Sequence, residues 1–173
     1  GISTFSERTG YGTPAFAARG MEITPGWEIV DLGMDPSGRV EARIGASPHG
    51  QGLRTALSQI IADQLGIEPA KVNVIHGDTD RTPYGFGTFA SRSAVISGGA
   101  SLLAAQKVRS KILQIAGRLL EASADDIELA EGVARVKGTD RLIPIEQVAR
   151  AAYHRAHLFS DLGPGLSESA SYD

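Results

Sequence analysis

Two short segments rich in glycine and serine carry the residues best suited to bind a ligand. The first lies directly before a helical pattern and consists of His49, Gly50, Gln51 and Gly52. The first N–H groups of a helix lack intrahelical partners and carry positive dipole potential, so they favour an anion. Glycine also lets a ligand come close to the main chain. The segment is therefore a candidate anion-binding loop.

The second segment opens a longer helical pattern and consists of Ala90, Ser91, Arg92 and Ser93. It follows a glycine-rich stretch over 85–87. Its hydroxyl groups are hydrogen-bond donors, and the guanidinium of Arg92 adds a forked cationic donor. Two such loops in one chain favour a single long anionic ligand that is bound at two places.

Plainer interpretations of these loops stay open. Glycine-rich loops before helices are often only turns in which a serine caps the helix. Neither loop has the Gly-Lys-Ser/Thr of a P-loop, and the 85–87 stretch lacks the third glycine of a dinucleotide fingerprint. His49 fits a base, a ligand, or a residue that only packs and hydrogen-bonds.

The other polar motifs give weaker signals. The segment 77–80 (Gly-Asp-Thr-Asp) resembles half of a calcium loop but lacks the downstream bidentate Glu. We interpret its aspartates as caps for backbone N–H groups. Lys107, Arg109 and Lys111 are interpreted as a solvated helix face. No Gly-x-Ser-x-Gly motif supports a serine hydrolase.

Composition excludes several classes of protein. The chain has 173 residues, of which 21 are glycine and none is cysteine, so it holds no disulfide and no cysteine-ligated zinc or iron–sulfur site. A net charge of −3 argues against a nucleic-acid surface, which usually needs a basic stripe. No apolar run approaches the roughly 20 residues that span a bilayer. The 42% hydrophobic content is ordinary for a folded domain.

The elements that hold the two loops are predicted from apolar spacing and turn residues. In order, they are a hairpin over 27–44, a helix over 53–65, a strand over 72–75, a helix over 91–122, a hairpin over 126–136 and a short helix opening at Pro144. Trp27, Ile29 and Leu32 mark the first strand. Gly98 and Gly99 are unfavourable inside a helix and indicate close packing of another backbone or a ligand. This order predicts an α+β fold or a mixed α/β sandwich.

We expect the chain to be one fragment of a larger domain. Residues 1–122 form a lobe that carries both loops, 123–157 form a hairpin plus helix, and 158–173 form a tail that leads to the rest of the protein. The chain opens without an initiator Met and closes in small and polar residues with no closing element.

The motifs taken together resemble those of one enzyme family. It is the molybdopterin-binding large subunit of the xanthine dehydrogenase, aldehyde oxidase and carbon monoxide dehydrogenase family. The matching segments, in order, are Thr9–Gly12, Phe16–Met21, His49–Gly52, Gly77–Asp80, Pro83–Gly85, Gly87–Ser93 and Gly165–Asp173. The resemblance covers nearly the whole chain.

The resemblance implies a molybdenum hydroxylase whose metal is held by the dithiolene of a pterin. In bacterial members this pterin usually carries a cytosine nucleotide. The family's Gly-Gln-Gly loop maps onto residues 50–52, with His49 adjacent, and its Ala-Ser-x-Ser segment maps onto 90–93. The implied fold is α+β, with lobes of mixed sheet and helices packed on one face.

The resemblance also implies partners and a location. The partners are the rest of the subunit, iron–sulfur and FAD subunits or domains, and a small-molecule substrate. The expected location is the bacterial cytoplasm, with the periplasm as the alternative.

One departure from the family bears on activity. The family's catalytic glutamate lies in a Gly-x-Gly-Glu motif that does not occur here, and Glu168 does not match it. We therefore expect the isolated chain to be inactive. The alternative is a non-catalytic cofactor-binding or interaction module of the same fold. An unrelated phosphate-ligand enzyme is disfavoured, because no general base is placed on either loop.

Overall fold

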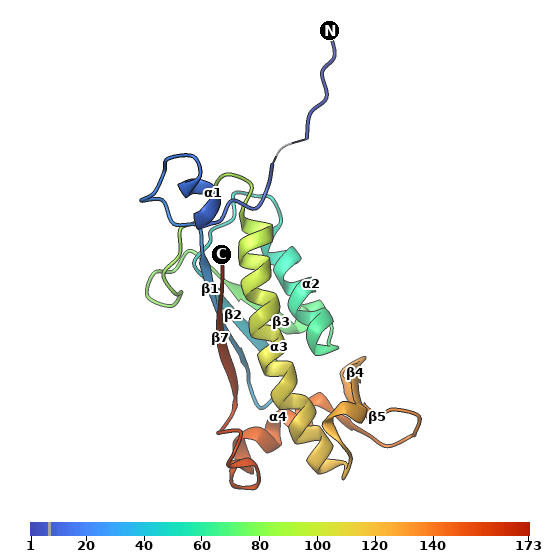
Figure 1. Cartoon of the computed structure of the whole chain (residues 1–173). Coiled ribbons are helices and arrows are strands. Elements are labelled where there is room, and N and C mark those ends of the chain that lie inside the picture. Colours follow the sequence, from blue (N-terminus) through green and yellow to red (C-terminus); the bar gives the residue numbers. More distant parts are fainter. Residues whose placement is uncertain (7) are drawn as a thin grey trace.

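The protein combines a four-stranded sheet with two long helices on one face, and a smaller three-stranded sheet lies beyond them (Figure 1). The structure is a computed structural model that describes residues 1–6 and 8–173. The strand order of the main sheet is β3-β2-β1-β7, and that of the small sheet is β4-β5-β6. The predicted α+β fold, with a mixed sheet and helices packed on one face, is confirmed.

The first hairpin forms where the sequence predicts it. β1 (Glu28–Met34) pairs antiparallel with β2 (Val40–Ile44). Asp35 stabilises the turn, because its Oδ1 accepts hydrogen bonds from the Ser37 hydroxyl at 2.6 Å and from the Ser37 N–H at 2.8 Å. These bonds, led by that of the hydroxyl, lower the pKa of Asp35. Gly38 completes the turn with φ of +80°, a value that glycine readily adopts.

The buried row of β1 includes only one of the three apolar residues that mark this strand in the sequence. Val30, Leu32 and Met34 are buried against the helices, whereas Trp27 and Ile29 are only half-buried. Side chains of a strand alternate between its two faces, so Ile29 and Leu32 cannot share one. Only Leu32 of the three sequence markers lies in the core.

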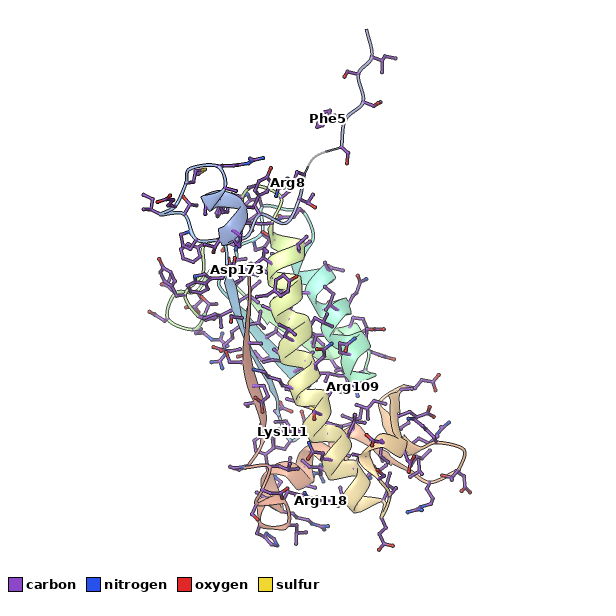
Figure 2. The ribbon with its side chains drawn as sticks, in the orientation of Figure 1. Phe5, Arg8, Arg109, Lys111, Arg118 and Asp173 are labelled. Carbon is purple, nitrogen blue, oxygen red and sulfur yellow. The ribbon has the colours of Figure 1, made fainter. Side chains whose placement is uncertain are left out.

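The two helices run in the same direction. α2 (Leu53–Leu65) connects β2 to the parallel strand β3 (Val72–Ile75), and α3 (Ser93–Leu119) follows β3. Gly98 of α3 lies against Ile60 of α2, and further along Arg109 donates to the carbonyl of Gln64 at 2.7 Å (Figure 2). Residue numbers thus rise together along both helices. Their N-termini lie at one end of the molecule, as do the carboxyl ends of β2 and β3 (Figure 1).

The predicted tail contains a strand that the sequence did not reveal. β7 (Leu166–Tyr172) pairs with β1 along its whole length, from Met34 opposite Leu166 to Glu28 opposite Tyr172. The expectation of no closing element is therefore wrong. The strand buries only Leu166 and Ala170 among serines, so its periodicity is weak, and pairing with a distant strand stabilises it.

Basic side chains of α3 hold β7 in place. Lys107 donates to the carbonyl of Ser169 at 2.7 Å, and Lys111 lies 3.4 Å from the carboxylate of Glu168 (Figure 2). The interpretation as a solvated helix face holds for Lys107, which is exposed, whereas Arg109 and Lys111 are half-buried; all three reach a neighbouring element. The helix glycines do pack closely, but the prediction of a backbone or a ligand there is wrong: Gly99 meets the ring of Tyr172, and Gly98 meets the side chain of Ile60.

The small sheet joins the same core. It consists of β4 (Ile127–Ala130), β5 (Val133–Val136) and the unpredicted β6 (Leu142–Pro144), and α4 (Ile145–His154) follows directly. Ile127, Ala134 and Val148 belong to the same buried cluster as the main sheet. The remaining short elements are α1 (Thr13–Ala17), η1 (Pro69–Lys71), η2 (Ala124–Asp126) and η3 (Ala156–Phe159). Within the described residues, no helix has the length and apolar content needed to cross a bilayer.

The two adjacent helix glycines predict opposite effects of the same substitution. A Cβ on Gly99 would lie 2.6 Å from the ring atoms Cγ and Cδ1 of Tyr172, whereas a Cβ on Gly98 would meet only the flexible end of Ile60 at 3.3 Å. We expect Gly99→Ala to lower the free energy of unfolding by about 1–3 kcal/mol through overpacking. Gly98→Ala should leave it unchanged or raise it by up to about 1 kcal/mol. Denaturant unfolding measures both, and equal effects would contradict the packing.

An ion pair between η1 and α4 predicts a pH effect. Lys71 Nζ donates to Glu146 Oε1 at 2.6 Å, which lowers the pKa of Glu146. A carboxyl with a lowered folded pKa contributes stability above its unfolded pKa of about 4.3, and this contribution is lost as pH falls through the folded pKa. We expect Glu146→Gln to cost less than about 1 kcal/mol at pH 7, because the pair is partly exposed. The difference from the unsubstituted protein should vanish in acid; a difference that persists there would contradict this assignment.

Candidate functional site

The first predicted loop is an open turn between β2 and α2. Gly50 and Gly52 have φ values of +101° and +79°, and a Cβ on either would meet nothing within 4 Å. His49, Gly50, Gln51 and Gly52 are all exposed. Gln51 Oε1 accepts the N–H of His49 at 2.5 Å, and no side chain caps α2. The loop thus leaves the N-terminus of α2 open to a ligand.

The second predicted loop is strained at two residues that are not glycine. Ala90 and Ser91 have φ values of +51° and +50°, in the left-handed region. Such a conformation costs on the order of 1–3 kcal/mol per residue and persists where the surrounding structure enforces it, often at functional sites. Ala90 is half-buried, Ser91 is exposed, and no side chain caps α3. Gly10 donates to the carbonyl of Ser91 at 3.2 Å, which secures the turn from one side.

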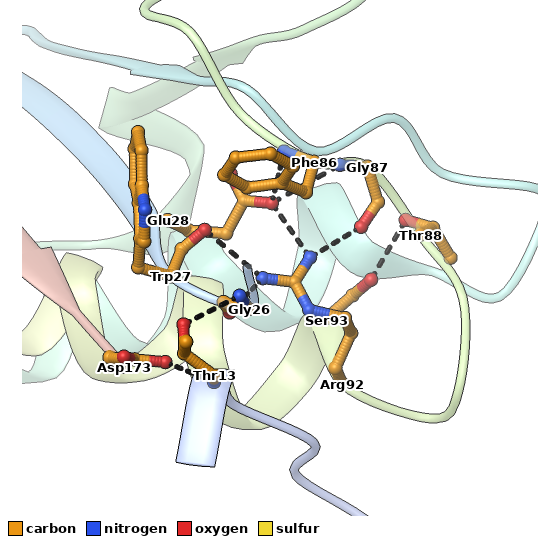
Figure 3. A network of polar contacts seen from close by, with 10 residues as sticks. All are labelled: Thr13, Gly26, Trp27, Glu28, Phe86, Gly87, Thr88, Arg92, Ser93 and Asp173. Carbon is orange, nitrogen blue, oxygen red and sulfur yellow. Dashed lines mark hydrogen bonds and ion pairs between the residues drawn. The ribbon is translucent and has the colours of Figure 1, made fainter. Parts of the chain in front are cut away.

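Arg92 does not serve as the predicted donor to an external anion. Its side chain is fully buried, and its Nη1 donates to Glu28 Oε1 at 2.7 Å and to the carbonyl of Gly87 at 2.6 Å (Figure 3). Its Nη2 donates to the carbonyls of Gly26 and Trp27. The sequence indicates a cation but not its partner, so the correction comes from the fold. Arg92 binds the protein's own chain.

Ser93 is also engaged within the protein. It is buried, and its hydroxyl donates to Thr88 Oγ1 at 2.8 Å (Figure 3). Ser91 therefore has the only exposed hydroxyl of the predicted segment 90–93. The donors that the second loop offers outward are this hydroxyl and the main chain at the start of α3.

Glu28 is the functional-site neighbour that sequence reasoning missed. It is 1% exposed, and its Oε1 accepts the N–H groups of Phe86 at 3.0 Å and Gly87 at 3.2 Å in addition to Arg92 (Figure 3). The available signal is its position: Glu28 has the same parity in β1 as the buried Val30. A carboxylate in a buried row needs a cationic or N–H partner.

Gly85 approaches protein rather than open space. A Cβ on Gly45 would lie 2.6 Å from the Cα of Gly85, and a Cβ on Gly85 would overlap Glu28 Oε2. Gly87, in contrast, has φ of +83° and nothing within 4 Å of its Cβ position. Gly45 and Gly85 thus leave room for the side chain of Glu28, whereas Gly87 faces outward.

The two loops share one end of the molecule. They follow the adjacent carboxyl ends of β2 and β3, where ligands bind in sheets with helical crossovers. A Cβ on Gly77 would lie 3.6 Å from Ser47 Oγ, so the connections after β3 and β2 touch. The hollow of about 810 Å³ at the other end of α2, near Gly66 and Leu129, contains none of the predicted residues.

The arrangement suits anion binding by main-chain donors. Among residues 1–6 and 8–173, no group of three His, Cys, Asp or Glu side chains could hold a metal ion. Asp78 Oδ1 accepts the N–H of Asp80 at 3.1 Å, which confirms its interpretation as a cap. His49 is exposed at the loop surface, and its role as a base or ligand stays a prediction.

Comparisons with known proteins agree with the geometry. A family model described as "Molybdopterin cofactor-binding domain" matches residues 1–173. The chain is 36% identical over 172 residues to the "6-hydroxypseudooxynicotine dehydrogenase complex subunit gamma" of Paenarthrobacter nicotinovorans, covering 99% of this chain and 20% of that protein. It is 35% identical over 175 residues to the "Carbon monoxide dehydrogenase large chain" of Hydrogenophaga pseudoflava, covering 100% of this chain and 21% of that one.

A solved structure has the same fold. Quinoline 2-oxidoreductase from Pseudomonas putida 86 superimposes with a TM-score of 0.83 at 35% identity, over 96% of this chain and 21% of that one. The chain therefore spans about a fifth of the length of the relatives it matches.

The buried pair predicts non-additive effects on stability. Removing one member leaves an uncompensated buried charge, so Arg92→Met and Glu28→Gln should each lower the free energy of unfolding by about 3–5 kcal/mol. The double variant leaves no isolated charge and should cost clearly less than the two single costs together. Denaturant unfolding of all four proteins completes the cycle. Additive costs would show that the two side chains do not depend on each other.

Proposed function

The chain belongs to the molybdopterin cofactor-binding domain family, and from that membership we propose that its two loops bind the phosphate and pterin portions of the cofactor. The observation that carries the proposal is that two helices begin side by side, both without side-chain caps, below loops whose outward residues are exposed. Such helix starts are anion sites.

The residues present fit the cofactor. Their outward donors are main-chain N–H groups, the amide of Gln51 and the hydroxyl of Ser91, which suit phosphate oxygens and the polar edge of a pterin. The open space at Gly50 and Gly52 leaves room for close approach.

Each loop has a distinct part in the proposal. Gly50, Gln51 and Gly52 donate to the cofactor at the start of α2, with His49 adjacent, and Ala90 and Ser91 donate to it at the start of α3. Arg92 and Ser93 act from inside the protein. Two helix N-termini suit a ligand with more than one phosphate, so we favour the cytosine dinucleotide form.

When bound, the molybdenum centre supplies the chemistry that inserts oxygen from water into a substrate or oxidises carbon monoxide. We propose that this chain contributes binding and orientation to a molybdenum hydroxylase and is inactive alone, because the glutamate motif of the family is absent from it. Iron–sulfur and FAD subunits or domains, the rest of the subunit and a small-molecule substrate are the proposed partners. The proposed location is the bacterial cytoplasm, with the periplasm as the alternative.

The competing proposal is a non-catalytic cofactor-binding or interaction module of the same fold. A Gly-x-Gly-Glu motif in the protein beyond these residues would favour the enzyme.

Cofactor content tests the loop assignment. In the intact large subunit, Gln51→Ala combined with Ser91→Ala should lower the molybdenum and cytosine nucleotide content at least tenfold, because two outward donors are lost. Gln106→Ala combined with Ser110→Ala makes the same changes on the exposed side of α3 and should leave the content unchanged. Metal analysis and nucleotide release measure both. Full content in the loop variant would refute the assignment.

A further inference from the structure

We propose that Glu28 is a positioning residue for the cofactor: through the guanidinium of Arg92, it holds the left-handed turn at Ala90–Ser91 in place. The proposal rests on the function proposed above for that turn. Glu28 is nearly fully buried and touches neither loop's outward surface, so its effect on a ligand must pass through the residues that it contacts, with Arg92 as the link to the second loop.

The turn needs an external support. Two consecutive residues other than glycine in the left-handed region are unfavourable, so the surrounding structure must enforce them. Gly10 secures the carbonyl of Ser91, and Ser93 bonds Thr88. Neither contact reaches the sheet, whereas that of Arg92 does.

Arg92 holds the two ends of the segment 87–92 together from its buried side. Nη1 bonds the carbonyl of Gly87 and Nη2 bonds the carbonyls of Gly26 and Trp27, while the ring of Phe89 lies 5.2 Å from the guanidinium. The planar fork of an arginine can satisfy these directions together. The side chain thus joins the start of α3 to the chain that enters β1.

Glu28 anchors the guanidinium of Arg92 to β1, the strand that it belongs to. β1 is paired on both sides, with β2 and β7, so the carboxylate starts from a rigid element. Its Oε1 accepts from Arg92, Phe86 and Gly87 together. The ion pair is buried from solvent, so the guanidinium depends on this carboxylate for its counter-charge.

The same carboxylate also reaches toward the first loop. Oε2 has no hydrogen-bond partner and lies against Gly85 and Gly45, and Gly45 directly follows β2 on the way to residues 49–52. A larger group at that place would push the two connections apart. Glu28 therefore sets the spacing of both loops at once.

The test uses the intact large subunit prepared without cofactor, so that loosening of the loop is not a consequence of an empty site. In Glu28→Gln, hydrogen exchange of the amides in residues 87–93 should accelerate at least tenfold at short exchange times, before exchange at the β1–β2 pairing, which reports global unfolding, becomes measurable. In the cofactor-loaded preparation, molybdenum content should fall at least fivefold. Glu146→Gln removes the partner of Lys71 elsewhere and is the matched control, which should change neither readout.

Arg92→Lys is the second variant and replaces Glu28→Gln if that protein does not accumulate. It keeps the charge but loses the fork, so the same segment should loosen. Unchanged exchange at 87–93, or faster exchange with full molybdenum content, would overturn the positioning role. Full molybdenum content in the Gln51→Ala, Ser91→Ala protein as well would overturn the proposed function itself, so the two failures are distinguishable.

Discussion

The buried ion pair between Glu28 and Arg92 is the constraint on which the loop-bearing end of the molecule depends. Burying two charges costs several kcal/mol per ion, and only good geometry with additional hydrogen bonds offsets that cost. Here Glu28 Oε1 gains two main-chain N–H groups and the guanidinium gains three carbonyls, whereas Glu28 Oε2 and Arg92 Nε have no hydrogen-bond partner. Such a pair adds little net stability, but it excludes other arrangements of the segments that it joins. In this protein one of those segments carries the second candidate loop, and Glu28 Oε2 lies near Gly45, which precedes the first.

Local patterns predicted most of the elements because their signals lie within a few residues. α2 ends at Gly66, a residue type that readily adopts the left-handed conformation found there, and Asp35 and Gly38 are residue types that favour the turn before β2. β7 could not be predicted in this way. Its small polar residues carry no strong pattern, and its strand conformation depends on pairing with β1 at the other end of the chain.

The candidate site was predictable in its loops but not in the support behind them. Glycine is the residue type that most readily adopts positive φ values, as Gly50 and Gly52 do, and the loop that they form is exposed, as a ligand-binding loop must be. The positive φ values of Ala90 and Ser91 could not be predicted, because residues with a Cβ disfavour that conformation. Arg92 was recognisable as a cation, yet its carboxylate lies 64 positions earlier in the chain, a separation that no local pattern encodes.

The late position of β7 also bears on how the protein is made. The Asp173 carboxylate accepts the N–H of Thr13, across 160 positions, and β7 lies beside β1 throughout. While the chain is being synthesised, β1 therefore keeps one bare edge until nearly the last of these residues has left the ribosome. Contacts of such long range slow folding, and unpaired edges promote association. α3 precedes β7 in the chain, so the position at Gly99 that receives the ring of Tyr172 already exists when β7 pairs with β1.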